Sequence, residues 1–479
     1  LTHTAGFDDM HFKNIYNHTS ESVTTLESIN RDKEALEVRW QPGKHHAYAN
    51  PGYGILGYLI EKQTKQSFDE YITEHIIAPL NIQHTQFGYK AGPQQTLSHG
   101  FSNGEFVENN EIYLAAAGNL SIPAKGIAQL GQYLLNPAKH AQIHHINLDT
   151  IRNMEHSYSS LAVEAGLTYG YGLGLYQTDR DGHLWVGHNG GIDQFITAFA
   201  YSRELNIGYV LMLNTDSMDY RKIANNLKGY LHQDAPAPQK AKAQTLTQDV
   251  AGYYRTRYPR QGFIEGISWL VGGVKVSQQD EQLSVSSLIS SEVKQLTHIG
   301  NGHFTNEGSS IATTVYITHP EHGNILHYDG AFLQKTSLLG AWLPLIYAVI
   351  FSICAMFTLL YMFVWCFNIF KKKITTKQQI IYRVLPTLPV LSLIVIALLF
   401  SQLSFILVTI KSFSTVAIYL LTWVFAITSI ASVWTSFKYS GSEPSRFARY
   451  YVPIASIFFS LAAINFAYHG YIGLALWAW

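Results

Sequence analysis

The sequence predicts an α+β domain, then a small mostly-β domain, then a membrane region of four helices. Three observations support this division. Residues 183–215 hold three β-rich runs, HLWVGHNG, FITAFAYS and IGYVLMLNT, with helical patterns on either side. Residues 249–333 hold many short alternating runs between turn residues. From residue 337 onward, four apolar stretches each exceed the roughly 18–20 residues that a helix needs to cross a bilayer.

Helices are predicted in the first half of the α+β domain. One covers about residues 53–64, and a second covers about residues 67–79. Ser67 can cap the second helix, because Glu70 stands three residues later as in a capping box. Pro79 is a natural stop, since proline cannot continue the backbone hydrogen bonding of a helix.

The second half of this domain combines helices with an antiparallel meander. The run AAAGNLS at residues 115–121 predicts a small-residue strand or turn. A helix is expected from Pro123 to about Leu135, with proline in its first turn. Residues 204–206 are a joint short enough for a hairpin between the last two β-rich runs. A further helix is expected over about residues 218–232.

Composition shifts predict the domain boundaries. Residues 233–248 are rich in Ala, Pro, Gln and Lys, which is typical of a linker. We therefore place the α+β domain at residues 1–232, the mostly-β domain at 249–335 and the membrane region at 336–479.

The membrane region has an asymmetric charge pattern. The predicted spans cover about residues 340–370, 385–407, 413–437 and 451–473. The loops after the first and third spans are basic, whereas the loop between the second and third holds only Lys411. The positive-inside rule places both basic loops in the cytoplasm. Residues 1–335 are then expected on the extracytoplasmic side of the plasma (cytoplasmic) membrane. The spans carry few ionisable groups, which favours an anchor over a transport pathway.

Charge and cysteine content exclude several classes of function. The 479 residues carry a formal net charge of +0, so nothing indicates a nucleic-acid partner. The cysteines Cys354 and Cys366 both lie in an apolar run, so no disulfide framework or cysteine-based metal site is expected. The chain begins with Leu1 and no signal peptide precedes it, so we expect a fragment truncated at its N-terminus.

Tyr48 and Asn50 stand two residues apart in the stretch QPGKHHAYANPGYGILGYL, residues 41–59. In an extended segment, residues two apart point to the same side. A phenol that can move a proton and an amide that can bind a carbonyl or N–H group would then share one cleft. Taken alone, however, Asn-Pro-Gly is also typical of a simple turn.

A second candidate lies at the end of a predicted strand, in WVGHNGGIDQF. Gly190 and Gly191 allow a ligand to approach the backbone closely, and a backbone N–H there can serve as an oxyanion donor. His188 can donate a hydrogen bond or shuttle a proton nearby. The plainer alternative is a glycine-rich bulge with a hydrogen-bonded histidine.

Four motifs in fixed order resemble the serine β-lactamase-like family, which includes class C β-lactamases, D-Ala-D-Ala carboxypeptidases and related esterases. They are LTHTAGF at the start, Tyr48-Ala49-Asn50 as Y-x-N, AAAGNLS, and His188-Asn189-Gly190 as the H-x-G form of K-T-G. The resemblance covers about residues 1–230. It implies a β-lactamase/transpeptidase-like antiparallel sheet flanked by helices, incomplete at its N-terminus. It also implies a serine hydrolase that works through an acyl-enzyme.

The resemblance assigns a role to each site residue. Tyr48 would act as general base or proton relay, and His188 would replace the K-T-G lysine. Asn50 would bind the substrate amide or order the Ser–Lys network. Asn189, Gly190 and Gly191 would line the substrate site, with the Gly191 N–H in the oxyanion hole. The implied partner is a small-molecule or peptide acyl substrate, with no cofactor, no metal and no indicated oligomeric state.

The nucleophile motif S-x-x-K should precede LTHTAGF in this family, and the sequence shows none there. One match, Ser291-Glu292-Val293-Lys294, lies downstream in the mostly-β domain and is interpreted as coincidence. Since a free tyrosine is a poor base unless a cation lies beside it, we expect that this chain does not acylate. Lys44 is too loosely placed to supply that cation.

Other functions stay open at this point. A non-catalytic penicillin-binding-like receptor or pseudoenzyme would keep the fold without turnover, and a transporter or assembly partner would use the domain structurally. A metal hydrolase is the other chemistry considered, because the chain holds 21 histidines. His140, His144 and His145 have helical spacing and His45-His46 lie beside Tyr48, but no third ligand with a nearby Glu base is placed as in H-E-x-x-H.

Overall fold

The computed structural model describes residues 1–18, 23–88, 97–102, 104–107, 110–139, 143, 147–192, 194–215 and 219–479. These residues form two compact units. The first comprises Leu1–Gly262 and Gly273–Ser337, and the second comprises Phe263–Gly272 and Leu338–Trp479.

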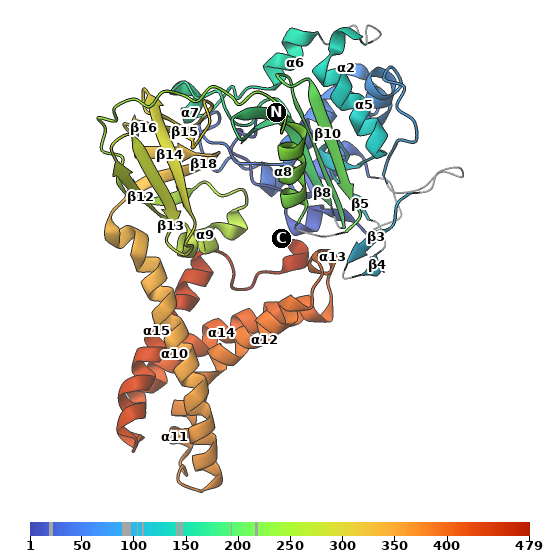
Figure 1. The fold of residues 1–479 in the computed structure, drawn as a ribbon. Coiled ribbons are helices and arrows are strands. Elements are labelled where there is room, and N and C mark those ends of the chain that lie inside the picture. The colour runs from blue at the N-terminus through green and yellow to red at the C-terminus, as the bar shows by residue number, and fades with distance from the viewer. Residues whose placement is uncertain are drawn as a thin grey trace. The chain divides into compact units, whose positions relative to one another are not determined.

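A four-stranded antiparallel sheet in the order β10-β9-β8-β7 organises the first part of the first unit (Figure 1). Its strands are β7 (Tyr176–Arg180), β8 (His183–Ile192), β9 (Phe195–Ser202) and β10 (Ile207–Leu213). The predicted meander is confirmed, since β8, β9 and β10 pair in sequence order. Its joint at residues 204–206 is a hairpin turn in which Asn206 has a φ of 54°. The fourth strand, β7, was not predicted.

Helices cover both faces of this sheet. Alternate side chains of a strand point to opposite faces, so neighbouring residues of β8 have different surroundings. Val186 packs in a core that includes Tyr133 of α5 (Ala124–Leu135). Trp185 is fully buried on the other face, where its ring lies 6.4 Å from that of His232, just after α8 (Tyr220–Leu231). This arrangement of helices on both faces of an antiparallel sheet confirms the α+β fold class.

The helical part follows the sequence signals closely. Helix α2 (Pro51–Thr64) precedes α3 (Phe68–Ile72), which continues as one π-helical turn, Thr73–Ile77. The Ser67–Glu70 capping box is present. The AAAGNLS run folds as a short helix α4 (Ala115–Gly118) and then strand β6 (Leu120–Ser121), because three consecutive alanines favour helix.

Shorter elements complete this part of the chain. The remaining helices are α1 (Thr25–Arg31), α6 (Leu148–Met154) and α7 (Leu161–Glu164), with 3-10 turns at Phe12–Asn14, Lys33–Leu36 and Pro137–Lys139. The short strands are β1 (Tyr16–Asn17), β2 (Gln86–Phe87), β3 (Gly100–Ser102), β4 (Glu105–Val107) and β5 (Glu111–Ile112). They pair antiparallel as β1–β5, β2–β6 and β3–β4.

The rest of the first unit is a closed antiparallel barrel of strands β11 to β18. The strands are β11 (Gly252–Arg257), β12 (Gly273–Gln279), β13 (Gln282–Ser287), β14 (Val293–Gly300), β15 (His303–Asn306), β16 (Ala312–His319), β17 (Gly323–Tyr328) and β18 (Ala331–Thr336). The first strand closes on the last, with Tyr253 opposite Thr336. Leu246 of the predicted linker is buried in the barrel core, so that end of the segment packs on the barrel.

The second unit holds four helices long and apolar enough to span a membrane, as predicted: α10 (Leu338–Phe370), the helical segment Lys377–Ser401, α14 (Phe413–Lys438) and α15 (Arg446–Tyr468). The second segment consists of α11 (Lys377–Val384) and α12 (Thr387–Ser401). Two short helices, α9 (Glu265–Val271) and α13 (Phe405–Val408), also belong to this unit. The second and fourth helices begin earlier than predicted, because Thr376 and Ser445 cap them within polar sequence.

The two basic loops of the second unit lie at the same end of the helices. Arg383, near the end of α11, and Glu443, in the segment between α14 and α15, form a buried ion pair. The Gln379 side-chain amide also donates to the Ser442 carbonyl at 3.1 Å. These contacts join the start of the second candidate span to the segment between the third and the fourth.

Candidate active site

The Tyr48 ring is held between two side chains from distant parts of the chain. His3, in the first motif, stacks on it with ring centroids 3.9 Å apart and planes inclined by 30°. The Arg260 guanidinium lies over the ring with its Cζ 4.4 Å from the centroid. A ring fixed by a stacked imidazole and a cation has little freedom to rotate away from its position.

Tyr48 is a protonated phenol at neutral pH. Burial raises its pKa to about 12, with Arg260 opposing this rise and the Asp9 carboxylate adding to it. Its hydroxyl has no hydrogen-bond partner among the residues that the structure describes. The group can therefore donate a proton as it stands. It needs a further cation nearby before it can act as a base.

Asn50 is fixed by one buried carboxylate. Its backbone N–H and its side-chain amide both donate to Asp9 Oδ1, at 2.9 and 2.8 Å. Pro51 follows as the first residue of α2, where a missing N–H costs no helical hydrogen bond. One of the two N–H groups on Nδ2 of Asn50 is thus engaged, and the second N–H and the side-chain oxygen Oδ1 remain for a ligand.

His188 faces the same cluster of aromatic rings. Its Nε2 lies 2.9 Å from the Tyr171 hydroxyl, and its ring centroid lies 6.2 Å from that of Tyr48. Burial lowers the pKa of His188, so the imidazole is neutral at pH 7. It can relay a proton or a hydrogen bond here, but it does not reproduce the positive charge of a lysine.

The end of β8 is open on one side. Strand β7 begins at Tyr176, opposite Gly187, so residues 188–192 of β8 run beyond it. Gly190 and Gly191 are exposed there, and a Cβ placed on Gly191 would meet nothing within 4 Å. Such an edge leaves backbone groups and free space for a ligand, as an oxyanion site requires.

The structure brings Tyr48 and His188 together, and it ties Asn50 to Tyr48 through Asp9 and Arg260. The roles of these residues, and of Asn189, Gly190 and Gly191, stay predictions. Sequence reasoning missed Asp9, Tyr171 and Arg260. His3 lies in the first motif, which the resemblance had identified, whereas nothing in the sequence around Arg260 pointed to the site.

Two features that the sequence had argued against stay without a role in this site: the S-x-x-K match at Ser291–Lys294, and Lys44. Ser291 precedes strand β14, and Lys294 pairs with Glu292 at 2.8 Å on exposed side chains. No helix begins there to present a nucleophile. Lys44 pairs with Glu164 at 2.6 Å, so its charge is already engaged.

Two groups of histidines bear on the question of a metal site. His140, His144 and His145 lie outside the described residues. At the tip of the β16–β17 hairpin, ligand atoms of His319, Glu321 and His322 lie within 4.8 Å of one another, on partly or fully exposed side chains. The sequence analysis did not single out this group.

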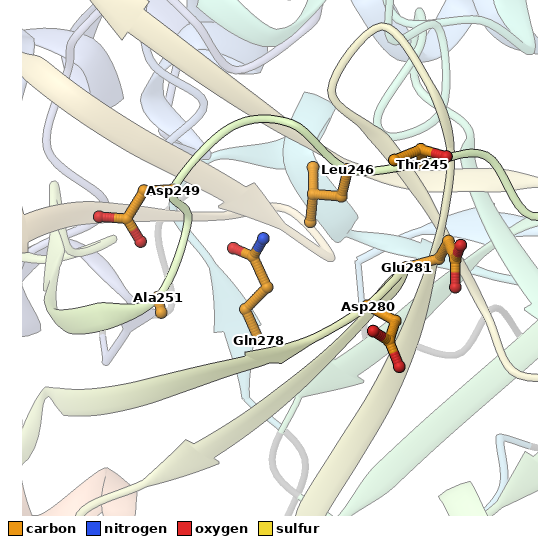
Figure 2. Close-up of a pocket in the computed structure, with 7 residues that line it drawn as sticks. All are labelled: Thr245, Leu246, Asp249, Ala251, Gln278, Asp280 and Glu281. Atoms are coloured by element: carbon orange, nitrogen blue, oxygen red, sulfur yellow. The ribbon is translucent and has the colours of Figure 1, made fainter.

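An open pocket of about 470 Å³ lies in the barrel domain, apart from the Tyr48 cluster (Figure 2). Its lining residues are Thr245, Leu246, Asp249, Ala251, Gln278, Asp280 and Glu281. The three carboxylates give it an acidic rim, and it holds no nucleophile paired with a base. We assign it no role in acyl transfer.

The first half of the chain is similar to known proteins. A family model described as Beta-lactamase matches residues 1–233. The chain is 26% identical over 219 residues to Protein flp of Staphylococcus aureus (strain MW2), covering 44% of this chain and 42% of that protein. It is 36% identical over 83 residues to a putative D-alanyl-D-alanine carboxypeptidase of Escherichia coli (strain K12), covering 16% and 18% of the two chains. The chain thus matches less than half the length of these relatives.

Among solved structures, the octameric penicillin-binding protein homologue from Pyrococcus abyssi has a TM-score of 0.39 at 18% identity, covering 70% of this chain and 77% of that chain. The D-amino acid amidase from Ochrobactrum anthropi SV3, complexed with D-phenylalanine, has a TM-score of 0.38 at 17% identity, covering 49% and 71%.

Proposed function

Residues 1–233 belong to the serine β-lactamase-like family, and from this we propose a membrane-anchored, extracytoplasmic serine hydrolase. Its reaction would transfer an acyl group from an ester, amide or D-amino-acid peptide to water. The 83-residue similarity to a putative D-alanyl-D-alanine carboxypeptidase supports the last of these substrate classes.

The arrangement of Tyr48 with His188 carries this proposal. Tyr48 has a fixed ring and a hydroxyl that no described residue hydrogen-bonds, and the Tyr171–His188 hydrogen bond lies beside it. Such a pair can pass a proton between a nucleophile and a leaving group. The exposed Gly190–Gly191 backbone next to His188 suits the oxygen of a tetrahedral intermediate.

In the proposed reaction a serine oxygen attacks the acyl carbonyl and gives up its proton to the Tyr48 network. The bond to the leaving group breaks, and the leaving group takes a proton from the same network. Water then attacks the acyl-enzyme, which releases the acid and restores the serine. The sequence given shows no S-x-x-K ahead of LTHTAGF, so the roles proposed here are those of the proton relay and the amide clamp.

The location is part of the proposal. The buried Arg383–Glu443 pair supports a common side for both basic loops. The positive-inside rule places that side in the cytoplasm, and residues 1–335 outside it. The four helices would then anchor the domain in the plasma membrane.

A second function, a non-catalytic penicillin-binding-like receptor or pseudoenzyme, has one observation in its favour. With a pKa of about 12 for Tyr48 and a lowered pKa for His188, neither group bears a charge at pH 7. A site that binds an acyl ligand without activating a nucleophile fits that state equally well.

Labelling separates these functions. The complete gene product would be treated with a fluorescent penicillin and, separately, with a fluorescent fluorophosphonate. A penicillin label that forms and then decays within minutes supports hydrolysis, and a persistent penicillin adduct supports a receptor. Absence of both adducts would rule out acyl-enzyme chemistry and leave a pseudoenzyme.

A further inference from the structure

A loop of the barrel domain lies directly on the Tyr48 segment. This loop, residues 258–262, follows β11. Tyr258 stacks on His45 with ring centroids 3.7 Å apart and planes inclined by only 17°. His45 is buried and stands three residues before Tyr48 in the chain. The loop therefore covers the same segment that carries the Y-x-N motif.

Backbone hydrogen bonds fix the loop to the first domain. Arg39 donates through Nη2 to the carbonyls of Pro259 and Arg260, at 3.2 and 3.0 Å. The Gly262 N–H donates to Asp8 Oδ1 at 3.0 Å. Contacts at both ends and in the middle hold this loop against the first domain, so it forms an ordered interface.

From this loop, Arg260 contacts Tyr48 directly and is linked to Asn50 through Asp9. Its Nε donates to Asp9 Oδ2, while the other oxygen of Asp9 accepts from Asn50. Its guanidinium plane also covers the Tyr48 ring. Asp9 is only 2% exposed, so its charge is neutralised chiefly by this one guanidinium.

From these contacts we infer that Arg260 is a positioning residue for the acyl-transfer site. The barrel domain supplies it. Arg260 holds the Tyr48 ring and, through Asp9, the Asn50 amide in one arrangement. The inference rests on the proposed function for its consequence in catalysis. The barrel domain is then a component of the active site and not only a spacer.

The charges around Tyr48 set the expected effect of losing Arg260. The titratable groups around the ring include His3, Asp9, Tyr53, Tyr171, Tyr176, His188 and Arg260. Arg260 lowers the pKa of Tyr48, and Asp9 raises it. Removing the guanidinium leaves the Asp9 charge uncompensated, so the phenol becomes harder to deprotonate.

The first experiment needs no enzymatic activity and uses this chain in detergent. A 3-fluorotyrosine at position 48 reports the environment and titration of the phenol by ¹⁹F NMR. Arg260→Gln is expected to move the resonance and to raise the titration midpoint by about 0.5–1 pH unit, less than a buried pair would give because Arg260 is half exposed. Arg260→Lys is expected to raise the titration midpoint by less than Arg260→Gln does, because lysine keeps the charge but loses the planar guanidinium contact.

Arg257→Gln is the matched control. Arg257 lies three residues earlier on β11, is exposed, and donates to Gln334 on the barrel. Its loss is expected to leave the fluorine signal unchanged. An Arg260→Gln protein with the wild-type melting temperature and the wild-type midpoint would overturn the inference. If Arg260→Gln unfolds, Arg260→Lys decides instead: a wild-type resonance and midpoint there overturn it.

The second experiment measures phosphonylation of the complete gene product by the fluorophosphonate, in which fluoride leaves. Arg260→Gln and Asp9→Asn are each expected to slow labelling about tenfold, and the double variant to be no slower than the slower single, because both break one linked contact. Additive losses would contradict that linkage. If the wild type is never labelled but the fluorine midpoint shifts as expected, the proposed reaction fails while the placement of Arg260 stands. If labelling proceeds and Arg260→Gln changes neither rate nor midpoint, the inference fails alone.

Discussion

The two halves of the candidate site are built in opposite ways. The Tyr48 half is packed: His3 and Arg260 cover the ring, and Asn50 is buried against Asp9. The half at the end of β8 is open, with Gly190 and Gly191 exposed beyond the reach of β7. A pre-organised group costs no reorganisation during a reaction, and an open strand edge gives a ligand its place. From this difference we propose that the packed half performs the chemistry and the open half receives the substrate.

The largest effect is expected from removing the Tyr48 hydroxyl. Tyr48→Phe keeps both faces of the ring and loses only the proton-carrying group. Labelling of the complete gene product by the fluorophosphonate is expected to slow by about 10²–10⁴-fold, the usual size of a general acid–base contribution. Tyr58→Phe, on helix α2, serves as the control. A Tyr48→Phe protein that labels at the wild-type rate would move the chemistry to another group.

Two glycines of β8, Gly187 and Gly191, are expected to respond to substitution in different ways. A Cβ on Gly187 would lie 2.0 Å from the Phe199 carbonyl oxygen, whereas one on Gly191 meets nothing within 4 Å. Gly187→Ala is therefore expected to cost about 1–3 kcal/mol of unfolding free energy. Gly191→Ala is expected to change stability by less than about 0.5 kcal/mol but to slow labelling several-fold, because the methyl group obstructs the open edge. Thermal melts and labelling rates measure both. The reverse pattern would show that Gly191 is structural.

The contacts of His11 with Asp8 and Asp32 are expected to weaken at alkaline pH. Burial lowers the pKa of His11, but hydrogen bonds to Asp32 and Asp8 outweigh it and raise the pKa to about 9. A pKa raised in the folded state gives stability that is complete below pH ~6.5 and is lost as pH rises through 9. Unfolding free energy should fall by up to about 3 kcal/mol over that range. Denaturant titrations at several pH values would show this fall in the wild type and in the exposed control His99→Gln, but not in His11→Gln. An equal fall in His11→Gln would assign it to other groups.

The smallest effect on labelling is expected from the S-x-x-K match in the barrel domain, Ser291–Lys294. Ser291 is exposed and no helix begins there, so Ser291→Ala should leave labelling unchanged within error. Mass spectrometry of labelled peptides provides the check. An adduct on Ser291 would make the downstream motif the nucleophile and would overturn its interpretation as coincidence.

Much of the fold was predictable because it depends on local patterns. The β8–β10 meander, the Ser67–Glu70 cap and the four apolar helices all follow from periodicity, capping residues and hydropathy. Errors arose where local rules compete. Three alanines formed helix α4 where a strand or turn was expected, and polar caps started two membrane helices early.

The site was only half predictable for a different reason. Tyr48, Asn50 and His188 stand in motifs with recognisable spacing, so the sequence pointed to them. Arg260 lies more than 200 residues from Tyr48 along the chain, in a loop of another domain without any motif. Asp9 matters only because it joins Asn50 to that loop. Contacts of this kind arise from domain packing, which no local pattern records.

The central claim is the proposal that Tyr48 belongs to the proton relay of an acyl-transfer site. The most direct measurement compares fluorophosphonate labelling of the chain that begins at Leu1 with labelling of the complete gene product, each with and without Tyr48→Phe. We expect no label on the chain that begins at Leu1, and a label on the complete product that depends on Tyr48. Tyr48-dependent labelling of the chain that begins at Leu1, or Tyr48-independent labelling of the complete product, would contradict the claim.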